Sequence, residues 1–342
     1  MTGVRKFLVA GCAFLAVAAA GSVAAVMIPT YVQDKLAVTP LDIRSSIVAS
    51  TPDGQGGDVL DTSTIASAGP LEVSTGVPLE LRRLITVEEP SDADKMTFQA
   101  SVTVSRGDRD PGLLTASVDR VTIDRRTAVP VEPAGSIQTA ANAQAVPLPR
   151  TGFQHRFPFG TEQKTYPVYD ATAWTTFPAE FVEAIDIDGV EIYHFRSTVV
   201  NQDLSLTTQS PINTVTLPAS KWGLEGDAPI TMKRYYSNTR EIYVEPRSGG
   251  LVGGQEQPFQ YFARDAAVPE VTILKASLSL SEESQAEQIA RAGDSVDKLE
   301  WIDRGPIILW TVAGVSLVVG LILLVAASRR PRGDAPNPTG QR

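Results

Sequence analysis

The chain has 342 residues, of which 43% are hydrophobic and 20% are charged, and its formal net charge at pH 7 is −9. An acidic surface of this kind repels polyanions, which excludes nucleic acid as a partner over any large area. The single cysteine, Cys12, lies in an apolar run near the N-terminus. The rest of the chain therefore has no disulfide and must be stabilised by its own hydrophobic core.

The first predicted element is an uncharged run over residues 7–28, which follows a short tail, residues 1–6, that ends in two basic residues. The length of the run predicts an uncleaved membrane-spanning helix. Two alternatives stay open for this segment. Val9-Ala10-Gly11-Cys12 matches a lipoprotein-type cleavage box that would place a lipid on Cys12, and small residues later in the run would suit cleavage of a plain signal peptide.

The sequence between residues 38 and 131 is typical of antiparallel β-structure. Apolar and polar residues alternate on a period of two over Met96–Val104 and less strictly over Leu113–Ile123, and Leu79–Val87 is predicted as a further strand. Asp53–Gly76 is rich in Gly, Ser, Thr and Asp, which predicts a loose loop.

Residues 134–150 are rich in Ala, Gln and Pro and show no periodicity. This composition fits either an inter-domain linker or a long crossing on the surface of one domain. The segment is therefore a candidate sub-boundary, and the sequence leaves both alternatives open.

An aromatic segment follows, between His155 and Phe177. One hypothesis is that its rings fill the core of a β-domain. The other is that some of them line an apolar groove for a lipid or a glycan, because aromatic faces suit both ligands. The candidate ligand-binding residues are Phe157, Phe159, Tyr166, Tyr169, Trp174 and Phe177, together with Tyr193 on a later strand.

Strand signals continue after the aromatic segment. Phe181–Ile187 and Val190–Val200 alternate on either side of Asp188-Gly189, a dipeptide that is typical of a two-residue hairpin. A further strand is predicted over Leu204–Thr208. Met232–Glu245 fits either a strand pair or one long bent strand, and a returning strand starts near residue 258.

Two helical elements end the chain. Ser279 and Glu282 form a predicted capping box, and a helix is expected from about residue 281 to residue 300. A second uncharged run, residues 307–327, is long enough to cross a bilayer, and Pro306 suits its first helical position. The predicted small and apolar face of the first helix consists of Ala286, Ile289, Ala290, Gly293, Val296 and Leu299.

The charged tails predict the topology. Basic residues accumulate on the cytoplasmic side of membrane spans, and both the tail 1–6 and the tail 328–342 are basic. Both tails are therefore expected in the cytoplasm, and residues 29–306, with 24 basic and 38 acidic residues, outside the inner (plasma) membrane. The predicted fold class is a mainly β (α+β) extracytoplasmic domain flanked by N- and C-terminal transmembrane helices.

Signatures of catalysis and of metal binding are scarce. The chain has no phosphate-binding Gly-x-x-x-x-Gly-Lys loop, no nucleophile elbow and no paired-cysteine metal site. His155 and His194 are the only histidines, and both are expected to pack among aromatic residues. Asp186-x-Asp188-Gly189 lacks the remaining ligands of a calcium loop and is interpreted as a turn. No enzyme activity, catalytic residue, metal or cofactor is expected.

Four segments carry a family likeness: His155–Thr161, Tyr166–Asp170, Gly189–Phe195 and Tyr243–Gly249. Together with the two-span layout, and over nearly the whole chain, they resemble the actinobacterial porin PorA family. The family occurs in bacteria with mycolic-acid envelopes and their relatives, and some of its members are named as channel formers. The resemblance implies an envelope protein and also a link to lipomannan and lipoarabinomannan maturation, but it supplies no catalytic residues. A weaker likeness, in topology alone, is to scavenger-receptor-type lipid transporters.

These observations lead to a functional hypothesis and an alternative. The preferred hypothesis is a membrane-anchored envelope-biogenesis factor whose β-rich domain binds a membrane lipid, a lipoglycan or a partner enzyme such as an envelope glycosyltransferase. The alternative is a pore-forming, porin-like envelope protein. A spanning barrel requires strands of about 9–11 residues with apolar outward faces, whereas two uncharged helices would hold this chain in the inner membrane. The sequence does not define the oligomeric state.

Overall fold

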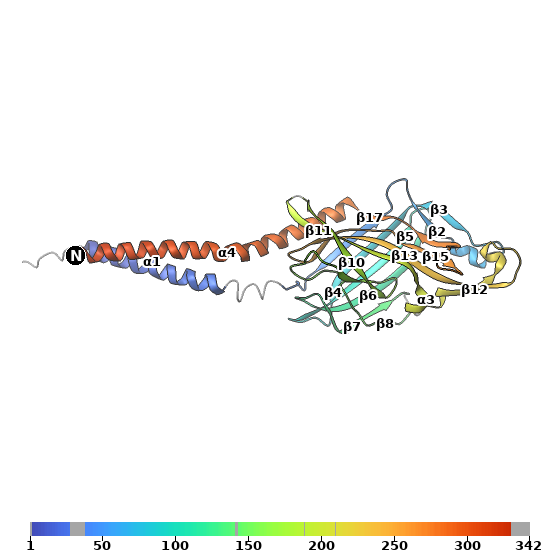
Figure 1. Ribbon diagram of the computed structural model, residues 1–342, viewed down its shortest axis with the longest axis horizontal. Helices are drawn as coiled ribbons and strands as arrows, with labels where there is room; N and C mark the ends of the chain where they lie inside the picture. The colour runs from blue at the N-terminus through green and yellow to red at the C-terminus, as the bar shows by residue number, and fades with distance from the viewer. Residues whose placement is uncertain (1, 28–37, 141–142, 188, 209, 330–342) are drawn as a thin grey trace, which may run out of the picture. The chain divides into compact units, whose positions relative to one another are not determined.

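The computed structural model describes residues 2–27, 38–140, 143–187, 189–208 and 210–329 (Figure 1). These residues fall into two compact units. Thr39–Ser295 form a β-domain, and the two terminal segments form a helical unit. The prediction of a mainly β domain flanked by two apolar terminal helices is confirmed.

The β-domain contains seventeen strands among its described residues, with four short helical turns between them. The strands are β1 (Arg44–Ser50), β2 (Gly57–Leu60), β3 (Val73–Val77), β4 (Leu79–Glu88), β5 (Lys95–Arg106), β6 (Leu113–Asp124), β7 (Pro130–Gln138), β8 (Val146–Pro147), β9 (Tyr166–Asp170), β10 (Thr175–Ile187), β11 (Val190–Asp203), β12 (Thr214–Pro218), β13 (Pro229–Glu245), β14 (Gly250–Glu256), β15 (Phe259–Ala263), β16 (Val271–Lys275) and β17 (Leu278–Leu280). The helical turns are η2 (Thr62–Ala66), α3 (Leu204–Thr207), η3 (Pro211–Asn213) and η4 (Ala219–Trp222).

The strand pairing forms one antiparallel network with β13 at its branch point. One series of neighbours runs β8, β7, β6, β5, β4, β1, β17, β14 and β13. The C-terminal half of β13 pairs with β14 along one edge and with β11 along the other, and β11 is followed by β10 and β9. The N-terminal half of β13 lies between β12 and β15, and β15 leads to β16, β2 and β3. We call β1, β4, β5, β6 and β7 the first wall, and β2, β13, β14, β15 and β16 the second wall.

The first wall follows the alternation that its sequence predicts. Leu79 and Leu81 of β4 face inward, whereas Arg82 between Leu81 and Arg83 faces outward with a 69% exposed side chain. The cross-strand partner of Arg82 is Thr103 of β5, so the outer face of this strand pair is polar. Successive side chains of a strand point to opposite faces, and this explains why the predicted strands at residues 79–87, 96–104 and 113–123 are all confirmed as β4, β5 and β6.

The predicted hairpin is also confirmed. The strands β10 and β11 pair up to Ile187 and Val190, so two residues connect them. Gly189 adopts a positive φ of 83° and donates its backbone N–H to Asp186 Oδ1 at 2.9 Å, an arrangement typical of a tight turn. Of the two alternatives for residues 232–245, the single long strand is correct, because β13 runs without interruption from Pro229 to Glu245.

Two local predictions are wrong. The predicted loose loop at residues 53–76 contains β2, η2 and most of β3, and Asp61 caps η2 by accepting the N–H of Ser63. The predicted strand at residues 204–208 is the single helical turn α3, because the side chain of Asp203 caps its start by accepting the N–H of Ser205 at 2.9 Å. In both places a short-range hydrogen bond from a backbone N–H to a carboxylate selects the helical turn over an extended chain.

The C-terminal helix α4 (Glu282–Ser328) starts where predicted, near residue 281, but its cap differs from the predicted capping box. Ser279 belongs to β17, and Ser281 caps the helix by accepting the N–H of Ser284 at 3.2 Å. Ala286 and Ala290 of the predicted buried face are exposed. The buried side of this part of α4 carries Ser284 and Ala292, and the hydroxyl of Ser284 accepts the N–H of Val48 of β1 at 3.0 Å.

The helical unit contains α1 (Thr2–Met27) and the C-terminal part of α4. Val4–Met27 and Arg304–Ser328 are long and apolar enough to cross a membrane. Pro306 lies inside α4 and does not begin a helix. The two helices pack through small residues: a Cβ on Gly11 would lie 2.9 Å from Leu324, and one on Gly21 would lie 3.3 Å from Ala313. Close packing of this kind is typical of helix pairs in membranes.

Candidate functional site

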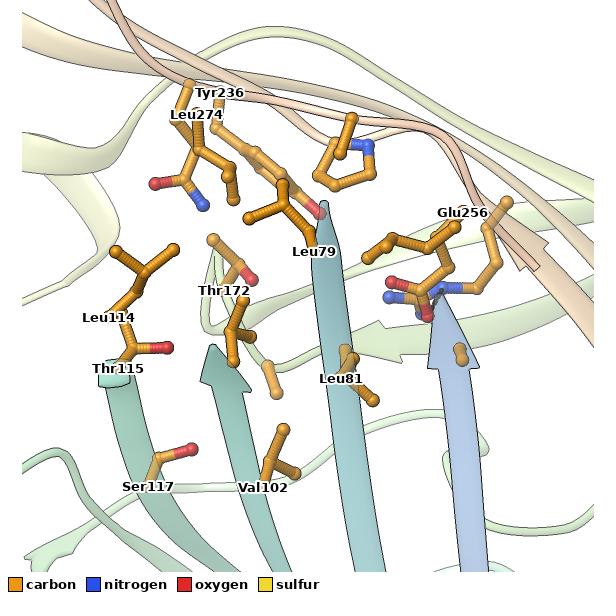
Figure 2. Close-up of a pocket in the computed structure, with 18 of the residues that line it drawn as sticks. Leu79, Leu81, Val102, Leu114, Thr115, Ser117, Thr172, Tyr236, Glu256 and Leu274 are labelled. Carbon is orange, nitrogen blue, oxygen red and sulfur yellow. Dashed lines mark ion pairs between the residues drawn. The ribbon is translucent and has the colours of Figure 1, made fainter. Parts of the chain in front are cut away.

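A cavity of about 580 Å³ lies inside the β-domain, between the first and the second wall. Its size is within the range of about 300–1,000 Å³ that is usual for small-molecule sites. Figure 2 shows Leu79, Leu81 and Val102 of the first wall on one side of the cavity and Tyr236 and Leu274 of the second wall on the other. Most of the lining side chains are aliphatic or aromatic, so the cavity suits a ligand with a large apolar surface.

The cavity reaches the surface beside η2 and η3. Ile65 of η2 and Ile212 of η3 line the cavity, and they are also 46% and 54% exposed to solvent. Trp222 of η4 packs edge-on against Phe262 of β15 at this side, with 5.5 Å between ring centroids. An apolar molecule could therefore enter the cavity beside these two exposed isoleucine side chains.

Polar side chains gather along the inner face of β13. Tyr236 donates its hydroxyl hydrogen to Asp170 Oδ2 at 3.0 Å, and Arg240 lies 3.3 Å from the same oxygen. Arg240 also pairs with Glu256 of β14 at 3.1 Å. Burial alone would raise the pKa of Glu256, but Arg240 and Arg83 hold it below its usual value. Glu256 is therefore ionised at neutral pH, and the group forms a charged network in the cavity wall.

A second polar group lies where residues 150–169 meet the first wall. Arg150 forms a buried ion pair with Asp119 of β6, and its guanidinium lies 4.1 Å from the ring centroid of Tyr169. Gln154 donates to the other oxygen of Asp119. Burial raises the pKa of Tyr169 to about 12, so its hydroxyl is neutral. The hydroxyl of Tyr169 and the carbonyl oxygen of Gln154 are buried without a hydrogen-bond partner, although both residues line the cavity.

His155 lines the cavity as a neutral side chain. Its ring packs edge-on against Phe98, with 5.3 Å between centroids, and its Nε2 is buried without a hydrogen-bond partner. Burial, together with the nearby charges of Arg83 and Arg150, lowers the pKa of His155 to about 3. The histidine therefore packs among aromatic residues, as predicted, and it adds an unpaired polar atom to the cavity wall.

We expect the His155→Gln variant to lose less stability than the unaltered protein when the pH falls from 7 to 5. The unfolded chain protonates its histidine near pH 6.5, whereas the folded chain keeps it neutral down to about pH 3, so stability falls as the pH drops below about 6.5. This difference amounts to about 2 kcal/mol at pH 5. Urea unfolding at both pH values measures it. Equal losses in the two proteins would contradict the neutral state of His155.

The aromatic candidates divide between cavity and core. Phe157 and Tyr169 line the cavity. Tyr166 is buried beside it, in a cluster with Phe195 and Phe157. The others are half-buried and do not line the cavity: Phe159 under the guanidinium of Arg156, Trp174 at a positive φ of 55°, Phe177 against the cluster around Tyr236, and Tyr193 against Phe181.

His194 lies away from the cavity. Its Nε2 lies 2.6 Å from Glu241 Oε2, and its ring stacks on Tyr243 with 4.7 Å between centroids. Among the described residues, no three or more His, Cys, Asp and Glu side chains are grouped as a metal site would require. Cys12 is exposed on α1.

Several cavity residues were missed by the sequence reasoning. Arg234, Tyr236 and Arg240 lie at alternate positions of β13, in register with Met232 and Ile242, which are buried. Charged residues at core-facing positions of a strand are unusual, so this pattern in the sequence could have indicated a polar site inside the β-domain. Asp119 carries the same signal, because it lies on β6 in register with Val121 and Ile123, which are buried. Glu256 lies at the end of β14, and strand pairing brings it to the cavity.

A family model described as Porin PorA matches residues 10–322. A protein named Porin PorA from Corynebacterium amycolatum is 33% identical over an alignment that covers 78% of this chain and 81% of that protein. Another Porin PorA, from Corynebacterium resistens, is 28% identical over an alignment that covers 91% of this chain and 94% of that protein.

Proposed function

Because the chain belongs to the porin PorA family, we propose that it is a porin-type envelope protein whose β-domain binds the hydrocarbon part of an envelope lipid or lipoglycan. The observation that carries the ligand-binding part is the apolar cavity of about 580 Å³ between the two walls of the domain. Each buried CH₂ group of a ligand would contribute about 0.8 kcal/mol. A long acyl chain could therefore be held by its apolar surface alone.

Membrane anchoring by α1 and α4 is part of this proposal. Both helices have the length and hydropathy of membrane spans. Their close approaches pair Gly11 with Leu324 and Gly21 with Ala313, so the helices are antiparallel, and the start of α1 and the end of α4 lie at the same end of the pair. This arrangement supports a two-pass topology in the plasma membrane, with both tails cytoplasmic and the β-domain outside.

Binding, and not catalysis, is the proposed role of the cavity. His155 is a buried neutral side chain, and the carboxylates among the described cavity residues are held by arginines or by His194. A general base needs a proton acceptor within reach of a reacting group. Neither His155 Nε2, which is unpartnered, nor His194, which pairs with carboxylates, is hydrogen-bonded to a hydroxyl or thiol nucleophile among the described residues. This supports a carrier or receptor for a lipid.

Filling the cavity is expected to abolish binding of a neutral amphiphile. Val102 of β5 lines the cavity, and the Val102→Trp variant would occupy part of it. In full-length protein in nanodiscs, a photoreactive hexadecanol should label peptides of the cavity wall, and Val102→Trp should reduce this labelling about tenfold or more. The reduction follows from the loss of two or more buried CH₂ contacts.

The matched control is Thr103→Trp, which adds the same ring to the outward face of the same strand, opposite Arg82. It should leave the labelling unchanged. Equal labelling of the Val102→Trp and Thr103→Trp proteins, with both folded, would contradict ligand binding in the cavity.

Pore formation is the second candidate, and the names of the relatives favour it. Both matched proteins are called Porin PorA, which fits a pore-forming role better than an envelope-biogenesis role. Lipomannan and lipoarabinomannan maturation has no support in these comparisons. The polar outer face of β4 and β5 lacks the apolar band of a membrane-spanning barrel, so a pore would require several copies of the α1–α4 pair. Stable conductance of the pure protein in planar bilayers would support this candidate, and its absence would leave ligand binding alone.

A further inference from the structure

Arg234 is the charged residue of the cavity that the fold leaves without a counter-ion. It lies on β13 directly opposite Phe262 of β15, and both side chains line the cavity. Its Nη2 donates to the side-chain oxygen of Gln260, a neutral group, and its Nε is buried without a hydrogen-bond partner. No ion pair of Arg234 is present in the described part of the chain.

The other arginines of the cavity region differ from Arg234. Arg150 is paired with Asp119, and Arg240 is paired with Asp170 and Glu256. Arg83 lies close enough to Glu256 to contribute to the lowered pKa of that carboxyl group. Each of these three cations is therefore balanced by a nearby carboxylate, and Arg234 is not.

Arg234 nevertheless stays charged at neutral pH. Burial lowers the pKa of its guanidinium to about 10, which is still well above 7. A buried charge without a partner is strongly unfavourable, and a hydrogen-bonded amide such as that of Gln260 cannot neutralise it. The guanidinium of Arg234 in the wall of this apolar cavity is therefore a candidate binding group for an anion.

The surroundings of Arg234 define what kind of anion fits. A guanidinium binds carboxylate and phosphate groups through parallel N–H···O bonds, and Gln260 offers an amide group beside it. Around these two residues the lining is hydrocarbon, from Phe262, Trp222 and Ile273. A small, fully hydrated anion would gain little from such walls, whereas an anion with a long hydrocarbon chain would bury that chain against them.

We propose that Arg234 and Gln260 bind the anionic head group of an amphiphile, a carboxylate or a phosphate, while its hydrocarbon chain occupies the apolar part of the cavity. This proposal rests on the proposed ligand-binding function and narrows the ligand to anionic amphiphiles. The head group lies inside the domain beside β13 and β15, and neutral amphiphiles bind less tightly because they leave Arg234 unpaired.

The test uses full-length protein in nanodiscs and the photoreactive hexadecanol described above, displaced by unlabelled competitors. Hexadecanoate and hexadecyl phosphate represent the two anionic head groups, and hexadecanol is the neutral competitor. We expect at least one of the anions to displace the probe at a concentration about tenfold lower than hexadecanol does, because hydrogen bonds to a charged group are strong in a buried site. The better of the two anions identifies the head group.

Arg234→Met should remove this preference, so that the better anion and hexadecanol compete equally. Arg234→Lys keeps the positive charge and should retain part of the preference. The matched control is Lys233→Met, which removes a neighbouring cation that pairs with Asp203 at 2.8 Å and has a 45% exposed side chain. This control should keep the full preference for the anion.

The outcomes separate the two proposals. If anions and hexadecanol compete equally in the unaltered protein, the head-group site is wrong while binding in the cavity stands. A preference for anions that persists in a folded Arg234→Met protein would also overturn the site. If hexadecanol does not label the cavity at all, the ligand-binding function itself fails.

Discussion

Replacing Asp170 by alanine is expected to lower the free energy of unfolding by about 3–5 kcal/mol, because it breaks a buried charge network. Asp170 is 3% exposed. One of its oxygens accepts the hydroxyl of Tyr236 and faces Arg240, and the other accepts the backbone N–H groups of Thr172 and Ala173 at 2.8 and 2.9 Å. Alanine would leave all of these donors without their acceptor in the cavity wall. Urea unfolding of the full-length protein at pH 7, followed by tryptophan fluorescence, measures the loss.

Glu180 provides the matched control for Asp170. It is an exposed carboxylate on β10, the strand that pairs with the strand of Asp170. Glu180→Ala should change the free energy of unfolding by no more than about 0.5 kcal/mol. A loss below about 1 kcal/mol for Asp170→Ala would mean that the network is not formed as described.

Replacing Phe195 by alanine is expected to cost about 3–5 kcal/mol as well, for a different physical reason. Phe195 is fully buried on β11, and its ring contacts those of Phe157, Tyr166 and Phe181, at centroid distances between 5.2 and 5.9 Å. Truncation removes this apolar contact and leaves a void that the neighbouring rings cannot fill. The difference between the free energies of unfolding of the variant and of the unaltered protein, both measured in urea, gives this loss of stability.

The control for Phe195 lies on the same strand. Val200 of β11 is 71% exposed, so Val200→Ala should have an effect within about 0.5 kcal/mol. Similar small losses at both positions would contradict the aromatic cluster as a core of the β-domain.

Local signals account for the parts of the fold that could be predicted. The alternation in Met96–Val104, the Asp-Gly hairpin signal before Val190 and the uncharged length of the terminal helices each depend on residues that are close in sequence. The errors occurred where one side chain decides between two backbone conformations. The carboxylate of Asp203 turns Leu204–Thr207 into a helical turn although its apolar pattern also fits a strand.

The cavity could not be predicted in the same way. Its lining combines Val102 of β5, Tyr236 of β13 and Leu274 of β16, which strand pairing brings together over more than a hundred residues of sequence. The aromatic segment shows the same limit: Tyr166 and Tyr169 are three residues apart, but only Tyr169 lines the cavity. Whether an aromatic residue lines the cavity depends on the face of the strand to which it belongs and on the irregular pairing of that strand. The composition of the aromatic segment indicates neither.

The most direct test of ligand binding in the β-domain is mass spectrometry of amphiphiles that remain bound to the purified full-length protein. We predict roughly one long-chain amphiphile per folded chain, displaced by hexadecanol and strongly reduced in the Val102→Trp protein but not in the Thr103→Trp protein, because the cavity of about 580 Å³ is the only part altered in the first variant. A folded protein that carries no amphiphile, and takes up none when hexadecanol or hexadecanoate is added, would contradict the account.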